Sequence, residues 1–295
     1  VRAALMQGHK VRAILRVGAS FGMQHSKLTV HAVGLTHTPE LEQALRGADV
    51  VVHVAAATRG GYARQHADTV EATEQLLAAM SAAGIERMVG LSSFTVYDYT
   101  ALEDGAMLKE DAPLEPEPQR RGVYTQCKLQ QECLFRAFGK RPGHGVVILR
   151  PGLVYDESQP WPPALGRALG SRCWLAMGPR DGLLPLVHVE DVASAVLGAI
   201  AVTEHDVTIV NLIEMPPPKR APLLQALNDS RQSRLWLVWF PWSLHRALAQ
   251  GLWRLTGKRK LPGLLDPQEL AARFKPLRYD NRAACAALTW QTRHR

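Results

Sequence analysis

Short apolar segments alternate with helical segments through the first half of the chain. The runs at 50–57, 87–92 and 145–149 are rich in aliphatic residues and are bounded by turn-forming residues, which is typical of strands buried on both faces. Helical spacing is found between them, over 68–83 and 124–138. This alternation predicts an α/β fold, a Rossmann-like doubly wound parallel sheet in which crossover helices join the strands.

The pattern loosens after residue 155, where Gly, Pro and Trp become frequent. A helix is expected after Asp191, which we expect to act as its N-cap. The sequence therefore predicts two domains. The Rossmann-like domain would comprise 1–155 with 186–213, and a smaller, mostly helical substrate domain would comprise 156–185 with 214–295.

Composition narrows the class of protein. The 295 residues are 46% hydrophobic and 21% charged, which is ordinary for a globular chain able to bury a large core. No run reaches the roughly 18 apolar residues of a membrane span, and the opening residues have no signal-peptide pattern. We therefore expect a cytoplasmic location.

The four cysteines form no CxxC pair and lack a His at zinc-site spacing, so reduced thiols and no metal are expected. They are Cys127, Cys133, Cys173 and Cys285.

The net charge of +8 is concentrated near the end of the chain. Residues 251–295 hold ten Lys/Arg and three Asp/Glu, whereas the other 250 residues hold 25 and 24. A neutral main body is unlike a nucleic-acid-binding protein, so no nucleic-acid partner is expected.

The sequence Tyr124-x-x-x-Lys128 lies on a predicted helix, and Ser92-Ser93 ends a predicted strand upstream. Residues four apart share one face of a helix. An ammonium group beside a phenol favours the phenolate, so Lys128 is expected to lower the pKa of Tyr124 and to make it a general acid or base. A serine at the end of the strand could then hold the same substrate oxygen.

These residues, together with Arg150-Pro151-Gly152, make the chain resemble the extended branch of the short-chain dehydrogenase/reductase superfamily, the NAD-dependent epimerase/dehydratase family. The matching segments occur in the family's order over nearly the whole chain. They are 8–13, 47–56, 92–97, 110–116, 150–155, 187–193, 279–283 and 288–290.

The resemblance implies roles for individual residues. Tyr124 would be the catalytic acid/base, Lys128 would also hold the nicotinamide ribose, and Ser93 would orient the substrate. Further cofactor contacts are implied for Ala55, Ala56, Pro151, Gly152 and Val154. Substrate contacts are implied for Phe94, Leu153 and His188.

The chain departs from the family pattern at its beginning. The opening strand and the GxxGxxG turn that cradles a pyrophosphate are absent, and Gly18-Ala19-Ser20-Phe21-Gly22 follows the wrong strand to replace them. We therefore expect a sheet without its first strand, an N-terminally truncated chain, and weak dinucleotide binding. Arg16 stands where NAD-preferring relatives often have an acid, which favours NADP over NAD.

The sequence constrains the substrate class less than it constrains the fold or the catalytic residues. Nucleotide-sugar members often carry an Asn where this chain has Leu153. Together with the apolar run 235–242, this favours a secondary alcohol or ketone on a bulky apolar, sterol- or flavonol-like, substrate. The alternatives are a nucleotide-sugar epimerase or dehydratase with retained NAD, and a non-catalytic cofactor-binding sensor or inactive fragment. Two partner surfaces also stay open: a homodimer face, and a peripheral membrane contact through the tryptophans and Lys258-Arg259-Lys260.

Overall fold

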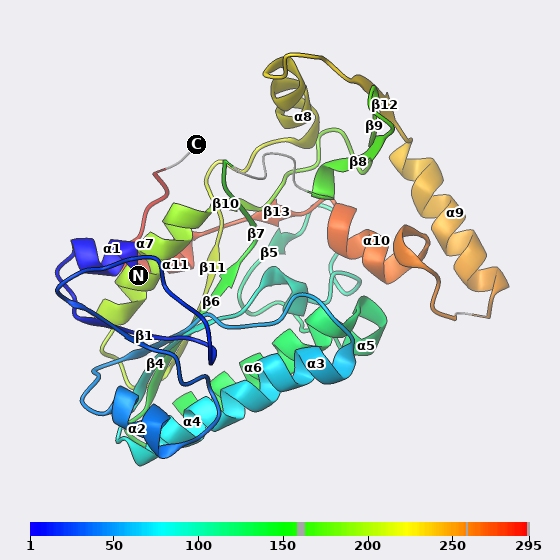
Figure 1. The fold of residues 1–295 in the computed structure, drawn as a ribbon. Helices are drawn as coiled ribbons and strands as arrows, with labels where there is room; N and C mark the ends of the chain where they lie inside the picture. The colour runs from blue at the N-terminus through cyan, green and yellow to red at the C-terminus, as the bar shows by residue number, and fades with distance from the viewer. Residues whose placement is uncertain (158–162, 258, 294–295) are drawn as a thin grey trace.

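The computed structural model describes residues 1–157, 163–257 and 259–293. Its centre is a four-stranded parallel sheet in the order β11-β6-β4-β3 (Figure 1). The strands are β3 (Val51–His53), β4 (Arg87–Leu91), β6 (Gly145–Pro151) and β11 (Val207–Leu212). The first three overlap the segments predicted to be strands. Within the segment 50–57, only the three residues of β3 form a strand. The residues after His53 therefore lie at the edge of the sheet.

Helices cover both faces of this sheet. Successive strand residues point to opposite faces, so Met88 and Ile148 pack on one side and Val89 and Leu149 on the other. The first side is covered by α2 (Pro39–Leu45), α4 (Ala72–Ala82) and α6 (Val123–Gly139). The second is covered by α7 (Val189–Ala201) and α11 (Arg282–Leu288). The doubly wound α/β fold is therefore confirmed.

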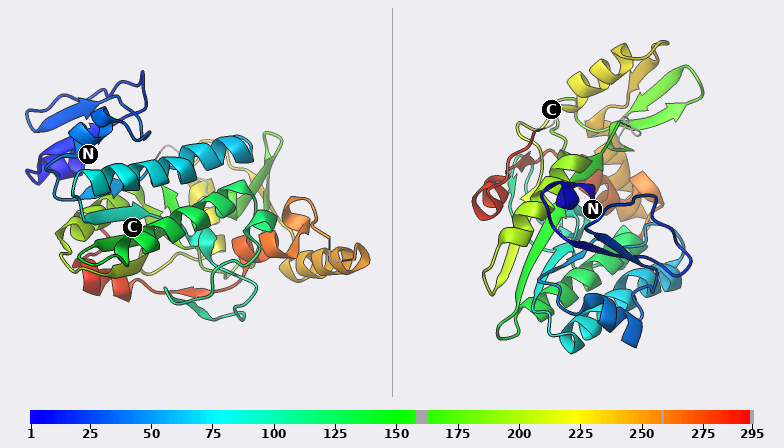
Figure 2. Two further views of the ribbon diagram at one scale, coloured as in Figure 1. Left: turned by 90° about the horizontal axis from the view of Figure 1, so that it is seen from below. Right: turned by 60° about the vertical axis from the view of Figure 1, so that its left-hand side comes forward.

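The N-terminal strands form a separate pair. After α1 (Arg2–Met6), β1 (Val11–Ile14) pairs in parallel with β2 (Leu28–His31), and the pair lies to one side of the main sheet (Figure 2). Among the described residues, β1 pairs only with β2, and β3 only with β4. The parallel sheet is thus in two parts, as expected for a sheet without its first strand.

The remaining elements surround the carboxyl ends of the main strands. β7 (Leu153–Tyr155) pairs with β10 (Leu186–His188), and β5 (Met107–Leu108) pairs with β13 (Arg278–Tyr279). A three-stranded sheet joins β12 (Trp236–Trp239), β9 (Cys173–Ala176) and β8 (Gly166–Leu169). The longer helices of this part are α8 (Arg220–Asp229), α9 (Trp242–Leu255) and α10 (Pro267–Phe274). Helices dominate, but the small sheet shows that part of the apolar run at 235–242 is a strand. The division into two domains stays a prediction.

Several shorter elements complete the chain. α5 (Pro118–Arg121) directly precedes α6, and single 3₁₀ turns occur at Phe94–Val96, Pro163–Leu165 and Gly263–Leu265. The helix expected over 68–83 begins earlier, as α3 (Tyr62–His66), and continues into α4 through the π-helical turn Ala67–Glu71.

The predicted N-cap of α7 was wrong. The helix begins at Val189, and the His188 side chain accepts a hydrogen bond from the Glu190 amide at 3.4 Å. Asp191 lies within the first turn and is buried, and its carboxylate accepts a hydrogen bond from the Arg293 amide at 3.0 Å. The reason is that β10 ends at His188, so that residue occupies the boundary position.

Within the described part of the chain, each helix is too short or too polar to cross a bilayer.

Candidate active site

A cleft of about 360 Å³ opens at the carboxyl ends of β3, β4 and β6. Ligands of open α/β sheets bind at this edge. The cleft brings together most of the residues that the sequence analysis assigned to catalysis, cofactor or substrate. Its predicted members are Ala56, Ser93, Tyr124, Lys128, Pro151, Gly152, Leu153 and Val154. It is completed by Val54, Thr58, Leu91, Ser92 and Tyr155.

Four predicted site residues do not line the cleft. Ala55 lies on its rim, where its carbonyl accepts a hydrogen bond from Gln131 Nε2 at 3.1 Å. The Phe94 ring is buried against Tyr97 and Tyr279 instead of facing the cleft. His188 is buried as the cap of α7. Arg16 follows β1 and is exposed.

Tyr124 lies in the first turn of α6, beside Ser93 at the end of β4. Burial raises the pKa of the Tyr124 phenol, and its hydrogen bond with the Ser93 side chain lowers that pKa by a smaller amount. The spacing of Tyr124 and Lys128 predicts a lowered pKa, but the effect of burial is larger in this structure. At neutral pH Tyr124 is therefore a protonated phenol, which can donate a proton.

Lys128 is buried one turn further along α6. Its ammonium donates hydrogen bonds to the Leu91 carbonyl at 2.5 Å and to Gln131 Oε1 at 2.6 Å. Burial lowers the pKa of Lys128, and the nearby Glu132 carboxylate raises it by a smaller amount, so that the net pKa is about 8. Lys128 thus holds the end of β4 against α6, and its charge titrates within the working range of an enzyme.

Gln131 is held by a buried polar network that the sequence did not predict. Its amide nitrogen donates a hydrogen bond to Thr73 Oγ1 at 2.9 Å, and Thr73 lies 2.8 Å from His53 Nε2. Burial and, to a smaller extent, the charge of Lys128 lower the pKa of His53 to about 4. His53 is therefore neutral at physiological pH. The network joins β3, α4 and α6 directly behind the cleft.

A second network supports the serine pair. Ser92 Oγ donates a hydrogen bond to Glu132 Oε2 at 2.5 Å, and the fully buried Arg150 guanidinium binds both oxygens of Glu132, at 3.0 and 2.6 Å. Burial raises the pKa of Glu132, but the hydrogen bonds and charge of Arg150 outweigh it and the net pKa is lowered. Arg150 also donates to the Tyr97 hydroxyl at 2.8 Å.

The wall opposite Tyr124 is formed by the turn from β6 to β7. A Cβ atom at Gly152 would lie 2.1 Å from the Pro185 carbonyl oxygen, so only glycine allows this close approach. Further along β7, the Tyr155 hydroxyl donates to Glu214 at 2.9 Å, and His188 packs edge-on against its ring at 5.3 Å. His188 therefore supports the cleft through Tyr155.

The cleft fits the nicotinamide and ribose end of a dinucleotide. Pro151 and Val154 supply apolar walls for a planar ring, and Lys128 uses two of its three N–H donors inside the protein, which leaves one for a ribose hydroxyl. The pyrophosphate end is different. No helix follows Gly18 or Gly22 between β1 and β2, so this segment is not a phosphate-binding turn.

The described cysteines are all free thiols. Among the described residues, no group of three or more His, Cys, Asp or Glu side chains is placed to hold a metal ion.

Comparison with known proteins shows which family this chain belongs to. A model of the NAD dependent epimerase/dehydratase family matches residues 1–212. The chain is 28% identical over 278 residues to the 4-hydroxy-2-methyl-3-oxo-4-farnesyl-3,4-dihydroquinoline-1-oxide ketoreductase of Stigmatella aurantiaca, covering 89% of this chain and 79% of that protein.

Solved structures of low sequence identity share the fold. A short-chain dehydrogenase/reductase superfamily protein from Agrobacterium tumefaciens with bound NAD aligns with a TM-score of 0.70 and 21% identity, over 100% of this chain and 88% of that one. A UDP-glucose-4-epimerase from Stenotrophomonas maltophila with bound NAD and formylated UDP-arabinopyranose aligns with a TM-score of 0.70 and 18% identity, over 99% and 88%.

A doubly wound parallel sheet with a cleft at the carboxyl ends of its strands defines a Rossmann-like protein. Within that class, the chain belongs to the NAD dependent epimerase/dehydratase family.

Proposed function

We propose that the protein is an NAD(P)-dependent oxidoreductase that interconverts a secondary alcohol and a ketone on a bulky apolar substrate. The observation that carries this proposal is the composition of the cleft. Ser93, Tyr124 and Lys128 line the same cleft as six apolar side chains, which outnumber the remaining polar lining residues, Thr58, Ser92 and Tyr155. The cleft thus combines a proton donor with a lining that is largely apolar.

In the reducing direction the ketone oxygen lies between Ser93 and Tyr124. When bound, the nicotinamide supplies the hydride to the carbonyl carbon. Tyr124 donates its phenolic proton to the carbonyl oxygen, which becomes the alcohol. Ser93 orients that oxygen by a hydrogen bond. The positive charge of Lys128 favours the negative charge that develops on the Tyr124 oxygen as its proton leaves. In the oxidising direction Tyr124 accepts the proton.

The cofactor proposed is NADP. Arg16 follows β1 and its guanidinium lies 3.6 Å from the Asp68 carboxylate, with 70% of its side chain exposed. A guanidinium held at this strand end suits a 2′-phosphate.

Two features support an apolar substrate. Leu153, not an amide residue, lines the cleft beside Val154. The ketoreductase that resembles this chain is named for a farnesylated quinoline oxide. The competing candidates are a nucleotide-sugar epimerase or dehydratase with retained NAD, and a cofactor-binding protein or fragment without turnover.

One experiment separates these candidates. The purified protein is incubated with NADPH and a bulky apolar cyclic ketone, and NADPH consumption is followed by absorbance. In parallel it is incubated with UDP-glucose and no added cofactor. Cofactor binding is measured by calorimetry. We expect ketone-dependent NADPH consumption that Tyr124→Phe reduces by about 100-fold or more, whereas Tyr62→Phe on exposed α3 leaves it unchanged.

The other outcomes each favour a different candidate. Sugar turnover without added cofactor supports the epimerase. Cofactor binding without turnover of either substrate supports the sensor, and neither binding nor turnover supports an inactive fragment.

A further inference from the structure

Helix α9 exposes a row of leucines. Leu244, Leu248, Leu252 and Leu255 are 49, 47, 38 and 85% exposed. Their spacing of four, four and three residues places them on one face of the helix. The neighbouring face is anchored to the protein, because His245 and Ala249 are buried and His245 Nε2 lies 3.0 Å from the Leu264 carbonyl oxygen. The leucine row is therefore held in place on the surface.

The strand that leads into this helix adds to the apolar surface. On β12, Trp236 and Val238 alternate along one side and are 79 and 49% exposed. Leu237 and Trp239 point to the other side and pack on the cluster around Leu224. β12 and α9 lie next to each other at the edge of the molecule (Figure 1). We call the exposed side chains of β12 and the leucine row of α9 the outer apolar face.

The charged side chains in the segment that contains β12 and α9 are all positive. Residues 230–265 contain seven Lys/Arg and no Asp or Glu. Arg254, Arg259 and Lys260 are exposed, and Lys258 lies outside the described residues. The four tryptophans of the segment lie among these cations along the chain. Aromatic, aliphatic and cationic side chains without carboxylates are the composition of a segment that lies on an anionic lipid interface.

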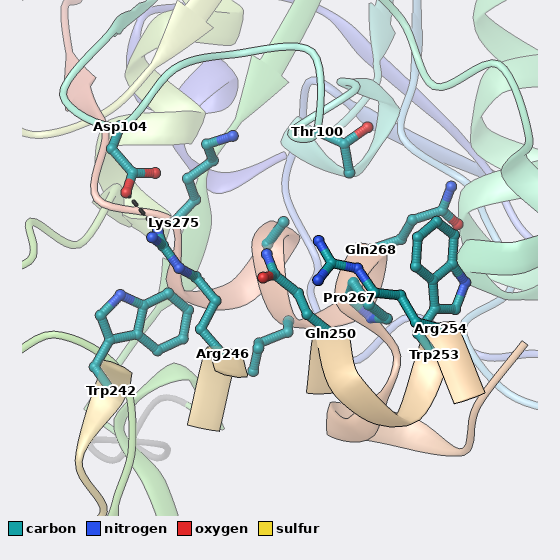
Figure 3. A pocket seen from close by; sticks show the side chains of 12 residues that line it. Thr100, Asp104, Trp242, Arg246, Gln250, Trp253, Arg254, Pro267, Gln268 and Lys275 are labelled. Carbon is teal, nitrogen blue, oxygen red and sulfur yellow. Dashed lines mark hydrogen bonds and ion pairs between the residues drawn. The ribbon is translucent and has the colours of Figure 1, made fainter. Parts of the chain in front are cut away.

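The inner side of α9 carries more positive charge. A cavity of about 370 Å³ separates α9 from α10 and the loop at residues 98–104, and Trp242, Trp253, Arg246, Arg254 and Lys275 line it (Figure 3). Arg246 is neutralised by Asp104 at 2.6 Å. Arg254 and Lys275 also line the cavity, and the carboxylates of Asp104, Asp98 and Glu103 act on Lys275. Cations therefore outnumber carboxylates among the residues that line the inner side of α9.

We propose that the outer apolar face, on α9 and β12, docks the protein on the surface of an anionic lipid bilayer. The leucine row and Trp236 would enter the boundary between headgroups and acyl chains, and the surrounding Lys and Arg side chains would contact anionic headgroups. Helix α9 has 14 residues and is about 21 Å long, so it would lie in the interface without spanning the bilayer.

Such docking would place the protein where an apolar alcohol or ketone dissolves. This consequence rests on the proposed function, but the docking itself is measured without turnover. The failure of one is therefore distinguishable from the failure of the other.

Vesicle co-sedimentation tests the proposal. The purified protein is mixed with vesicles of phosphatidylcholine, with or without phosphatidylserine, and the bound fraction is measured. We expect binding to the phosphatidylserine vesicles that falls as salt is raised. The double variant Leu248→Glu, Leu252→Glu should weaken binding by about tenfold or more, since each exposed leucine loses its apolar contact with lipid. Met6→Glu, at an apolar position on α1 that is more exposed than either leucine, is the control and should bind as the wild type does.

The outcomes that would overturn the proposal are specific. One is the absence of wild-type binding to either vesicle, and another is equal loss of binding in the double variant and in Met6→Glu. The third is a dimer in gel filtration that the double variant converts to a monomer while vesicle binding is absent, which assigns the face to a second copy of the chain. Circular dichroism and thermal unfolding of each variant verify that it is folded.

Discussion

The ammonium nitrogen of Lys128 lies 2.6 Å from Oε1 of Gln131, one turn further along α6. A buried lysine is thus held by a neutral amide and a backbone carbonyl, whereas the nearby carboxylate of Glu132 is occupied by Arg150. Among the described residues no carboxylate forms an ion pair with Lys128, and burial is the main cause that lowers its pKa to about 8. The titration of this lysine falls where activity can be measured.

The first prediction concerns pH. Lys128 is charged below its pKa, so kcat/KM for the proposed reaction should fall as pH rises through about 8. Gln131→Glu places a carboxylate beside the ammonium and should raise the pKa of Lys128, moving this decline to higher pH. Gln43→Glu makes the same change on the exposed side of α2 and should leave the profile unchanged. An identical decline in wild type and Gln131→Glu would show that another group controls it.

The second prediction separates two adjacent serines. Ser93 contacts Tyr124, whereas Ser92 donates to the buried Glu132. Ser93→Ala should lower kcat by about 100-fold with little loss of stability. Ser92→Ala should lower the free energy of unfolding by about 1–3 kcal/mol, because a buried carboxylate loses a donor, and should cost less turnover. Steady-state kinetics and urea unfolding of both variants measure the contrast. The reverse pattern would exchange the two roles.

The third prediction concerns cofactor choice. Arg16→Glu should reduce the preference for NADPH over NADH by about tenfold or more, because it removes a charge-assisted contact with a 2′-phosphate and adds repulsion. The ratio of the two kcat/KM values is the measurement. Since both cofactors are tested on the same variant, a general loss of stability cancels. An unchanged ratio would remove Arg16 from the cofactor site.

The fourth prediction concerns acid stability. His53 has a pKa of about 4 in the folded protein, against about 6.5 in an unfolded chain. The unfolded state therefore binds the proton first as pH falls. The stability contributed by neutral His53 is complete above about pH 6.5 and is lost progressively as pH falls from about 6.5 to about 4, a total of about 3 kcal/mol.

Urea unfolding at pH 7 and pH 4.5 measures this effect. His53→Gln should lose less stability than the wild type between these two pH values. His9→Gln, at an exposed position, should behave as the wild type does. An equal acid dependence in His53→Gln and wild type would assign the loss to other groups.

The sequence was most informative where chemistry depends on local spacing. The strands and helices around the sheet were placed to within a few residues, because apolar periodicity is a property of the segment itself. The sequence was less informative where partners lie far apart in the chain. Arg150 and Glu132 are 18 residues apart, and Lys128 and Leu91 are 37 apart. No local pattern indicates that these groups meet.

What the sequence by itself determined is the class of fold and the side chains available for chemistry. The alternation of segments sets the parallel sheet, and the spacing of Tyr124 and Lys128 sets one helix face, since both follow from backbone geometry alone. Tertiary structure decided the electrostatics and the surface. Burial raised the pKa of Tyr124 where spacing alone predicted a lowering. Packing turned Phe94 into the core and left Leu248 exposed, because burial depends on neighbours that only the fold brings together.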